Sequence, residues 1–454
     1  MLSGMIESML VFWLSGSALL VAANRFRIPG QYVGSFQISV RLALPMGLGL
    51  LFRYAAELII GNSQGADLLC VAVGAVSIPT LVRDLVQLFA TFKSAPRQAL
   101  KRLGGLAIFI VIWGPLACLC LFDPIILGDA KEIWFFHAKI IFYANGIHQN
   151  SGFSAPSILF SHPDYPKLLP VIGSTMARFN GAWNDHVPKF SVALLLLPTF
   201  AFAADLLVQR RIFAGLIFLA LVWSGGGPLL YSGYVDPILS ASIALMVLAL
   251  FFAVESGDND LFGVAALAGA LIINLKAEGL PLLGLTLPAF LWALDGNVRR
   301  KSPFTPKVIL PLVLAGICYA VWANWAVRLG LVNDMSGDKG AAWGRFISRV
   351  GDQAQWQLCL DYFGQFIGSG VILAAILIAN LAFYIARPDL FRRKLALAAN
   401  LAALSYAAFM LLVYLSTHHD LAWHLHYSSY RTLMSAQTLM GMSLVLMSGA
   451  GVRT

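Results

Sequence analysis

The sequence predicts an all-α protein, a polytopic bundle of about 13 transmembrane helices with long extracytoplasmic loops that contain interfacial helices. Apolar residues make up 59% of the 454 positions and charged residues only 12%, with a mean hydropathy of +0.77. A soluble domain of this length could not bury so much apolar surface. Runs of about twenty residues with few charges recur along the chain, as bilayer crossing requires. They are continuous rather than alternating, which excludes an outer-membrane β-barrel.

The predicted spans leave two long loops, at about 123–188 and 329–366. Residues 1–103 contribute N-terminal transmembrane helices of unassigned role. The first span lacks a basic start and a small-residue cleavage site, so it is expected to be a retained helix rather than a signal peptide. The stretch 261–275 is short and is expected to be tilted or half-inserted. The predicted spans cover residues 5–24, 38–61, 66–90, 104–122, 189–207, 212–230, 236–254, 261–275, 279–295, 308–328, 367–386, 395–416 and 432–450.

The basic residues predict the orientation of the chain. Its net charge of +9 comes from Lys and Arg that cluster in alternate connections, for example at 93–102, 299–307 and 387–394. This is the positive-inside pattern, which reports orientation and indicates no nucleic-acid partner. Both long loops then lie outside the cytoplasm. We expect a multi-pass protein of the bacterial cytoplasmic (inner) membrane whose active site is extracytoplasmic.

Several common kinds of site have no signature here. The five cysteines are scattered and show no metal-ligand spacing. The chain has no Walker phosphate loop, no dinucleotide-binding glycine fingerprint, no His-Glu-x-x-His and no Gly-x-Ser-x-Gly. ATP hydrolysis, hydride transfer and zinc proteolysis therefore lack support. The sequence predicts no cofactor; a divalent metal ion remains open without being indicated.

The loop 123–188 concentrates the polar groups of an otherwise apolar chain. Asp129 and Glu132 stand three residues apart at the start of the aromatic, amphipathic segment 131–144, so we expect them to share one helical face near its N-terminus. Such an acid can accept a proton from a substrate hydroxyl or help to hold a divalent cation. Simple capping of the helix start by Asp129 is the alternative.

The same loop contains the segment His-Pro-Asp-Tyr-Pro at 162–166. Its two prolines fix the backbone and present His162, Asp164 and Tyr165 in a rigid polar turn. We expect these three side chains to line a substrate site. An ordinary X-Pro turn is the alternative, but it does not explain three polar side chains together.

Two further polar groups stand at predicted helix ends on the same face. Asp236 closes the segment 231–236 at the mouth of a helix, and Lys276 and Glu278 lie between two apolar runs. Ionisable residues near a membrane helix end are costly unless they are paired or functional. We expect all three to bind substrate, with interface anchoring as the alternative for Lys276 and Glu278.

The last polar cluster, at 420–431, contains His424 and Arg431 as candidate substrate-binding residues. Arg431 is expected to open the final helix on the extracytoplasmic side, where the positive-inside bias disfavours an arginine. An anionic partner is therefore predicted. The planar guanidinium suits two phosphate oxygens, and a salt bridge to Asp420 is the alternative.

Taken in order, these motifs resemble those of the GT-C superfamily of membrane glycosyltransferases, in its bacterial members that use polyprenyl-phosphate-linked sugars. The resemblance covers roughly residues 104–450, so residues 104–454 are expected to form a GT-C-like catalytic module. One departure is Ala130, where an acidic pair with Asp129 is common in the superfamily; this puts metal dependence in doubt. The matching segments are 128–130 with Trp134 and Ala138-Lys139, then 162–166, 233–237, 276–279, 420–425 and 428–431.

The resemblance implies a mechanism and partners. Asp129 would act as the base on the acceptor hydroxyl, and the lipid phosphate would leave with inversion at the sugar carbon. Arg431, with Lys276, would hold that phosphate. The expected partners are a polyprenyl-phosphate-linked sugar donor, a lipid or cell-envelope glycan acceptor, and membrane lipid.

Two other functions stay open from the residues. An O-antigen ligase or polymerase has a similar shape and a large external loop. A transporter for a lipid-linked or small anionic substrate would place charged groups at mid-membrane, in broken helices of a repeat. Convergence of Asp129, Lys276 and Arg431 on one cavity would favour the transferase.

Overall fold

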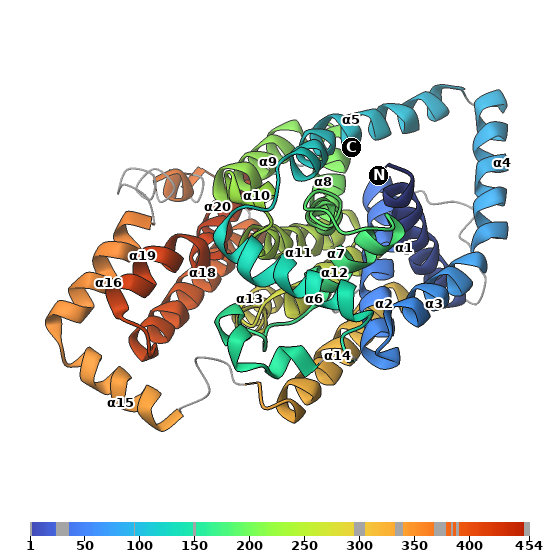
Figure 1. The fold of residues 1–454 in the computed structure, drawn as a ribbon. Helices are drawn as coiled ribbons and strands as arrows, with labels where there is room; N and C mark the ends of the chain where they lie inside the picture. Colours follow the sequence, from blue (N-terminus) through green and yellow to red (C-terminus); the bar gives the residue numbers. More distant parts are fainter. Residues whose placement is uncertain are drawn as a thin grey trace.

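The computed structural model describes residues 2–23, 36–94, 96–148, 151–294, 305–331, 339–366, 378–382, 385–386 and 390–448. Every regular element within these ranges is helical, and no strand occurs among them (Figure 1). The all-α prediction is therefore confirmed for the part of the chain that the structure describes.

Seven helices in the described residues are long and apolar enough to cross a membrane. These candidate spans, found by length and composition, are consistent with a membrane protein, but the predicted number of about 13 is not confirmed. The spans are α1 (Leu2–Ala23), π-helical η1 with α2 (Ser39–Ala43 and Leu44–Ile60), the Leu103–Phe122 part of α5 (Pro96–Phe122), α8 (Phe190–Val208), α11 (Asp236–Ser256), α14 (Pro306–Arg328) and α18 (Leu390–Ser416). Shorter helices are α9 (Ile212–Gly226), α12 (Asp260–Leu275), α13 (Gly279–Leu294) and α20 (Met434–Ser448).

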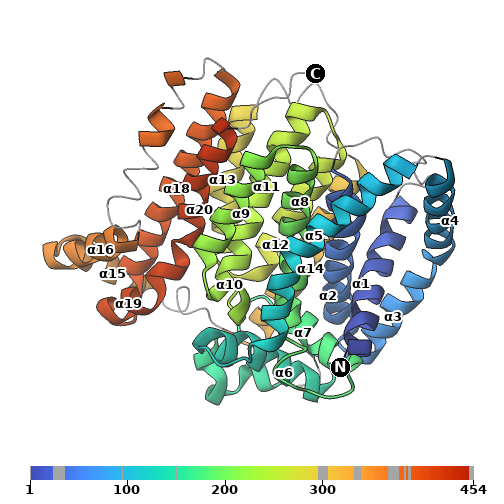
Figure 2. The same cartoon turned by 90° about the horizontal axis from the view of Figure 1, so that it is seen from above.

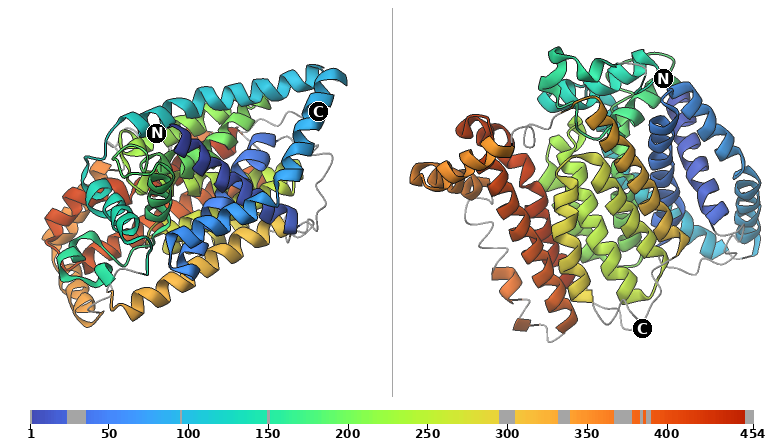
Figure 3. Two further views of the ribbon diagram at one scale, coloured as in Figure 1. Left: turned by 45° about the vertical axis from the view of Figure 1, so that its right-hand side comes forward. Right: turned by 90° about the horizontal axis from the view of Figure 1, so that it is seen from below.

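These helices stand side by side, and α11 and α12 lie near the middle (Figure 2). Helices α1 and α2 lie at one side, and α18 and α20 at the other. The segment 123–188 covers one end of the bundle, which we call the loop face, and α1 begins at this end (Figures 2 and 3). The core is continuous and consists of aliphatic and aromatic side chains from nearly every helix.

The predicted span 66–90 is wrong, because two helices replace it. Helix α3 (Ser63–Ala75) ends at a turn, and α4 (Ile78–Ser94) then runs across the bundle axis, lengthwise in Figure 1 and nearly end-on in Figure 2. Pro79 fits the first turn of a new helix, where no N–H partner is needed. The Ser77 hydroxyl secures the corner by donating to the carbonyls of Leu14 and Gly74. The predicted span 367–386 falls largely outside the described residues.

The loop 123–188 is built from short helices. They are the π-helix η2 (Ala130–Trp134), α6 (Phe135–Ala144), the 3-10 turns η3 (Ser151–Ser154) and η4 (Pro156–Ser161), and α7 (Leu168–Phe179). The helix expected over 131–144 is thus present. Helix α7 differs from the expected surface helix, because nearly all its residues are buried. It contacts α1, α2, α6 and α8, so its apolar residues are shielded by protein.

An ionic network ties the N-terminal helices to this loop. Arg178, at the end of α7, contacts Asp67 of α3 at 2.5 Å, and Asp67 also accepts from Arg53 of α2 at 2.7 Å. Arg53 in turn pairs with Glu57 at 2.8 Å, and both side chains are fully buried. Burying such charges is tolerated only when they are paired and hydrogen-bonded. The first helices, which carry no recognisable motif, therefore hold the loop in place.

The second long loop contains α15 (Lys339–Val350) and α16 (Gln353–Phe366), which project beside α18 (Figure 3). Arg349 donates to the carbonyls of Tyr414, Leu415, Thr417 and His419. These carbonyls belong to the C-terminal end of α18 and the residues after it, which have no further helical turn to bond. A cation at this end also complements the helix dipole. The arginine thereby fixes α15 to α18.

Candidate functional site

Five charged residues from four distant segments come together at the loop face. They are Asp129 before η2, Asp236 at the start of α11, Lys276 and Glu278 between α12 and α13, and Arg431 in the last turn of α19 (Leu421–Thr432). Salt bridges join them into one group, Asp129 to Arg431 to Asp236 to Lys276 to Glu278. All five were predicted as site residues, and the structure brings these five into contact.

Lys276 is the centre of the inner part of this group. Its Nζ lies 2.9 Å from Asp236 Oδ1 and 3.0 Å from Glu278 Oε1. Helix α12 ends one residue earlier and Lys276 itself is extended, so the side chain reaches across to α11. Burial alone would lower the pKa of Lys276, but Asp236 and Glu278 together raise it well above its ordinary value. Lys276 is therefore a fixed cation at this site.

Arg431 forms the outer part of the group. Its guanidinium pairs with Asp129, its Nη1 lies 3.9 Å from Asp236 Oδ2, and its central carbon lies 5.0 Å from the Tyr234 ring. Burial opposes the charge, but Asp236 and Asp129 raise the pKa of Arg431 above its ordinary value. The structure thus shows a salt bridge to an acid, as the alternative expected, but the acid is Asp129 rather than Asp420, whose carboxylate caps α19 by accepting from Trp423 N at 2.8 Å.

The helix boundary near Arg431 differs from the prediction. Arg431 was expected to open the final helix, but it lies in the last turn of α19, and α20 begins at Met434. The expected connection before it is itself helical, because Asp420 supplies an N-cap that the sequence pattern did not reveal.

Glu132 does not join the group, although it was predicted to share a helical face with Asp129. The segment between them is a π-helix, Ala130–Trp134, whose wider turn removes the three-residue register of an α-helix. Asp129 faces Arg431, whereas Glu132 is exposed. Asp129 also makes no side-chain capping bond, so capping does not account for it.

A close approach of two turns allows this geometry. Gly233, with φ +104°, precedes α11, and a Cβ added there would lie 2.8 Å from the Phe135 ring and 3.0 Å from Ala130. Only glycine adopts this backbone and leaves that space. The absence of a side chain lets the η2 turn, and Asp129 with it, lie against the start of α11.

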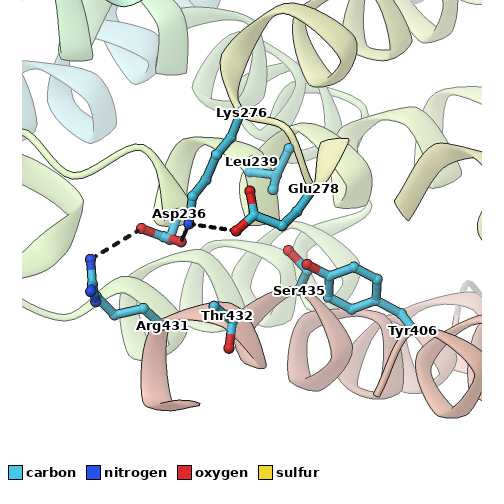
Figure 4. Close-up of a pocket in the computed structure, with 8 residues that line it drawn as sticks. All are labelled: Asp236, Leu239, Lys276, Glu278, Tyr406, Arg431, Thr432 and Ser435. Atoms are coloured by element: carbon cyan, nitrogen blue, oxygen red, sulfur yellow. Dashed lines mark hydrogen bonds and ion pairs between the residues drawn. The ribbon is translucent and has the colours of Figure 1, made fainter. Parts of the chain in front are cut away.

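A narrow pocket lies beside these charges, too tight to admit a water molecule (Figure 4). Asp236 Oδ2 and Glu278 Oε2 are buried there without a hydrogen-bond partner among the described residues. Sequence reasoning missed Tyr406 and Ser435, whose only signal was a hydroxyl group inside an apolar helix. The lining consists of Asp236, Leu239, Lys276, Glu278, Tyr406, Arg431, Thr432 and Ser435.

The His162–Pro166 turn lies next to the group. His162 has a left-handed backbone, φ +51°, and its ring stacks on Tyr165 at 4.9 Å. Tyr165 also stacks on Trp134 at 5.7 Å, and burial, with Glu278 nearby, raises its pKa well above the ordinary value. The carbonyl of Asp164 accepts from Trp322 Nε1 at 2.9 Å. Among the three predicted residues, Tyr165 lies close enough to Lys276 and Glu278 for their charges to act on its pKa.

His424 sits apart from the five charges. Its Nδ1 lies 2.9 Å from Thr417 Oγ1, and its ring packs at 4.9 Å from Tyr414 and 5.3 Å from His419. Burial, reinforced by His419 and Lys276, lowers its pKa to about 4. These contacts describe a neutral histidine packed between α18 and α19.

His424 is expected to make the fold sensitive to acid. Its unfolded-state pKa is 6.5 and its folded-state pKa is about 4, so below pH 6.5 the unfolded chain binds a proton that the folded chain refuses. Stability should fall as pH drops from about 6.5 to 4. The variant His424→Asn keeps a polar atom near Thr417 and removes this titration. Its Tm should fall less over that range than the wild-type Tm; equal slopes would contradict the assignment.

The arrangement combines two cations and three anions, so the group carries a net charge of −1 when all five are ionised. One acid, Asp129, is the least enclosed of the three, with 26% of its side chain exposed. No cluster of three or more metal-ligating side chains occurs in the part of the chain that the structure describes.

No protein-family model matches the chain, and no curated protein or solved structure matches it.

Proposed function

We propose that this protein is an integral membrane glycosyltransferase. It moves a sugar from a polyprenyl-phosphate carrier to a lipid or cell-envelope glycan acceptor, with inversion at the sugar carbon. The proposal rests on the resemblance of its motifs to the GT-C superfamily and on one structural observation. That observation is the contact between Asp129, Arg431, Asp236, Lys276 and Glu278 at one end of the bundle.

In the proposed reaction, Asp129 takes the proton of the acceptor hydroxyl. The acceptor oxygen bonds to the anomeric carbon from one side, while the bond to the carrier phosphate breaks on the other. The departing phosphate carries the negative charge. Arg431 lies beside Asp129 and can bind that phosphate through two N–H groups. No step requires a cofactor.

A charged group placed at helix ends also argues for this function over a transporter. Asp236 begins α11, Lys276 follows α12, and Arg431 ends α19. A transporter would be expected to hold such charges at the middle of its spans. The described charges of this group instead stand at the ends of helices, as the proposed function requires.

Mass spectrometry of envelope lipids and glycans from cells with and without the protein tests the proposal. We expect one sugar to be missing from a lipid or glycan of the deletion strain. The wild-type gene should restore it, and an Asp129→Asn gene should not. An unchanged envelope, together with no transfer by purified protein from any polyprenyl-phosphate sugar supplied, would contradict the proposal.

The proposed orientation gives a separate prediction. Ser154 is exposed on the loop face, and Asn259 is exposed between α11 and α12 at the opposite end. In a Cys118→Ser background, an impermeant thiol reagent should label Ser154→Cys in intact cells. It should label Asn259→Cys only after lysis. The reverse pattern would place the loop face in the cytoplasm.

A further inference from the structure

The His162–Pro166 turn has a strained backbone. His162 is left-handed, with φ +51° and ψ +63°, and this conformation costs energy in a residue that carries a Cβ. Pro163 follows it, and the residue before a proline is normally extended. Strain of this kind persists only where the surrounding structure over-determines it. Neighbouring groups must therefore hold this turn in place.

Two side chains from outside the turn bond its carbonyl groups. Lys167 Nζ donates to the carbonyls of Pro163 at 2.8 Å and Tyr165 at 2.7 Å. Trp322 Nε1, from α14, donates to the carbonyl between them, that of Asp164, at 2.9 Å. Three successive carbonyls thus accept from Lys167 or Trp322, and the turn is fixed at each of them.

Lys167 is buried in apolar surroundings. Its side chain is fully enclosed, and its Nζ lies 5.0 Å from the centre of the Phe153 ring and 4.7 Å from that of the Trp322 ring. Burial lowers the pKa of Lys167 well below its ordinary value, so a charge here is costly. An ammonium and a neutral amine can both donate to two carbonyls, so these bonds do not depend on the protonation state. The hydrogen bonds to the turn offset the burial of the amine.

The turn determines where Tyr165 stands. Its ring stacks on His162 at 4.9 Å and on Trp134 at 5.7 Å. Besides burial, the charges of Glu278 and Lys276 act on its pKa, so the tyrosine lies near the charged group. A displacement of about 1 Å at such a site can cost roughly a hundredfold in rate. Loss of either donor to the turn is therefore expected to move a hydroxyl whose place matters.

We infer that Lys167 and Trp322 are positioning residues, which act on sugar transfer by holding the Tyr165 hydroxyl near the charged group. The inference rests on the proposed function for the reaction that Tyr165 serves, but the placement of Tyr165 can be measured without it. If Lys167 and Trp322 served the fold alone, they would stabilise the loop without acting through Tyr165.

The first measurement is the fluorine NMR spectrum of the purified full chain, with a ring-fluorinated tyrosine in place of Tyr165. The otherwise wild-type chain should give one narrow line. Lys167→Met and Trp322→Phe remove the donors to the turn and should give a shifted line or several lines. Lys189→Met is the matched control, because this second fully buried lysine, at the end of the same loop, pairs with Asp123 at 2.6 Å instead. Its line should match wild type.

The second measurement is a double-mutant cycle in the rate of transfer from a polyprenyl-phosphate sugar. Tyr165→Phe should lower the rate about tenfold or more, as loss of a hydrogen bond to a charged group does, and Lys167→Met should lower it by a similar factor. In the Tyr165→Phe background, Lys167→Met should cost less than about twofold more, because residues that act through one another are not additive. A role in the fold alone would give the same loss in both backgrounds.

Changed fluorine lines together with a non-additive loss of rate support the inference. Unchanged lines in Lys167→Met and Trp322→Phe overturn it, and so does an equal loss from Lys167→Met in both backgrounds. A rate within about twofold of wild type in Tyr165→Phe or in Lys167→Met also overturns it. If wild type transfers no sugar, the proposed function fails by itself, and the fluorine lines alone decide whether Lys167 and Trp322 place Tyr165. Trp322→Phe, which removes a single N–H donor, carries both measurements if Lys167→Met does not fold.

Discussion

Asp129→Asn is expected to reduce sugar transfer by about a hundredfold or more, since loss of a general base typically costs that much. Asparagine has nearly the same shape, so expression and folding should remain near normal. The measurement is the initial rate of transfer from a polyprenyl-phosphate sugar in reconstituted membranes. Glu132→Gln is the matched control, because Glu132 is exposed three residues away and outside the charged group; its rate should stay within a few-fold of wild type.

The contact between Asp129 and Arg431 makes this prediction sharper. If Asp129 acted only by holding Arg431, its removal would weaken binding of the carrier phosphate. If Asp129 is the base, its removal takes away one carboxylate that competes for Arg431, so binding of a polyprenyl-phosphate analogue should be unchanged or tighter. A rate within a few-fold of wild type, or a parallel loss of analogue binding, would remove Asp129 from the role of base. Asp164 would then be the next acid to test.

The sequence predicted the fold class and all five residues of the charged group, for identifiable reasons. Apolar runs and their flanking charges are local features, so the helices α1, α8, α11, α14 and α18 were expected close to where they lie. The membrane also limits where charges can stand, so Asp236, Lys276 and Arg431 could be recognised as unusual from their positions alone.

The other features of the site depend on three-dimensional geometry that the spacing of residues in the sequence does not encode. The π-helix after Asp129 turned Glu132 away from the site. Tyr406 and Ser435 lie inside apolar helices, where a single hydroxyl carries little signal, and only the packing of α18 and α20 against α11 and α13 brings them to the pocket. The pairing of Asp129 with Arg431 joins residues about three hundred positions apart, which no local pattern reports.

Arg431→Ala is expected to lower transfer by about a hundredfold or more, and Arg431→Lys by a smaller but clear factor. Removal of a donor that stabilises developing negative charge costs roughly 100- to 1,000-fold in other enzymes. Lysine restores the charge without the planar fork that can bind two phosphate oxygens. Both variants should bind a polyprenyl-phosphate analogue more weakly than wild type, and Arg431→Ala the more weakly of the two.

The effect of Arg431→Ala on the stability of the fold must be separated from its effect on transfer. Arg431 is only 11% exposed and neutralises Asp129 and Asp236. Removing one partner of such a pair leaves an uncompensated charge, at a cost of roughly 3–5 kcal/mol when fully buried. The exposure of Asp129 reduces that cost. The Tm of Arg431→Ala should therefore fall, and the double variant Arg431→Ala with Asp129→Asn should recover part of it, because the stranded carboxylate is gone.

Activity and analogue binding give the decisive comparison between a phosphate-binding and a purely structural Arg431. In the double variant the Tm should rise, while transfer and analogue affinity stay low, because the phosphate partner is still missing. Asp420→Ala serves as the control for α19: it removes the N-cap that accepts from Trp423 N, costs about 1 kcal/mol of stability, and should leave analogue affinity unchanged. If the double variant regains analogue affinity together with its Tm, Arg431 serves the fold alone and the carrier phosphate binds elsewhere.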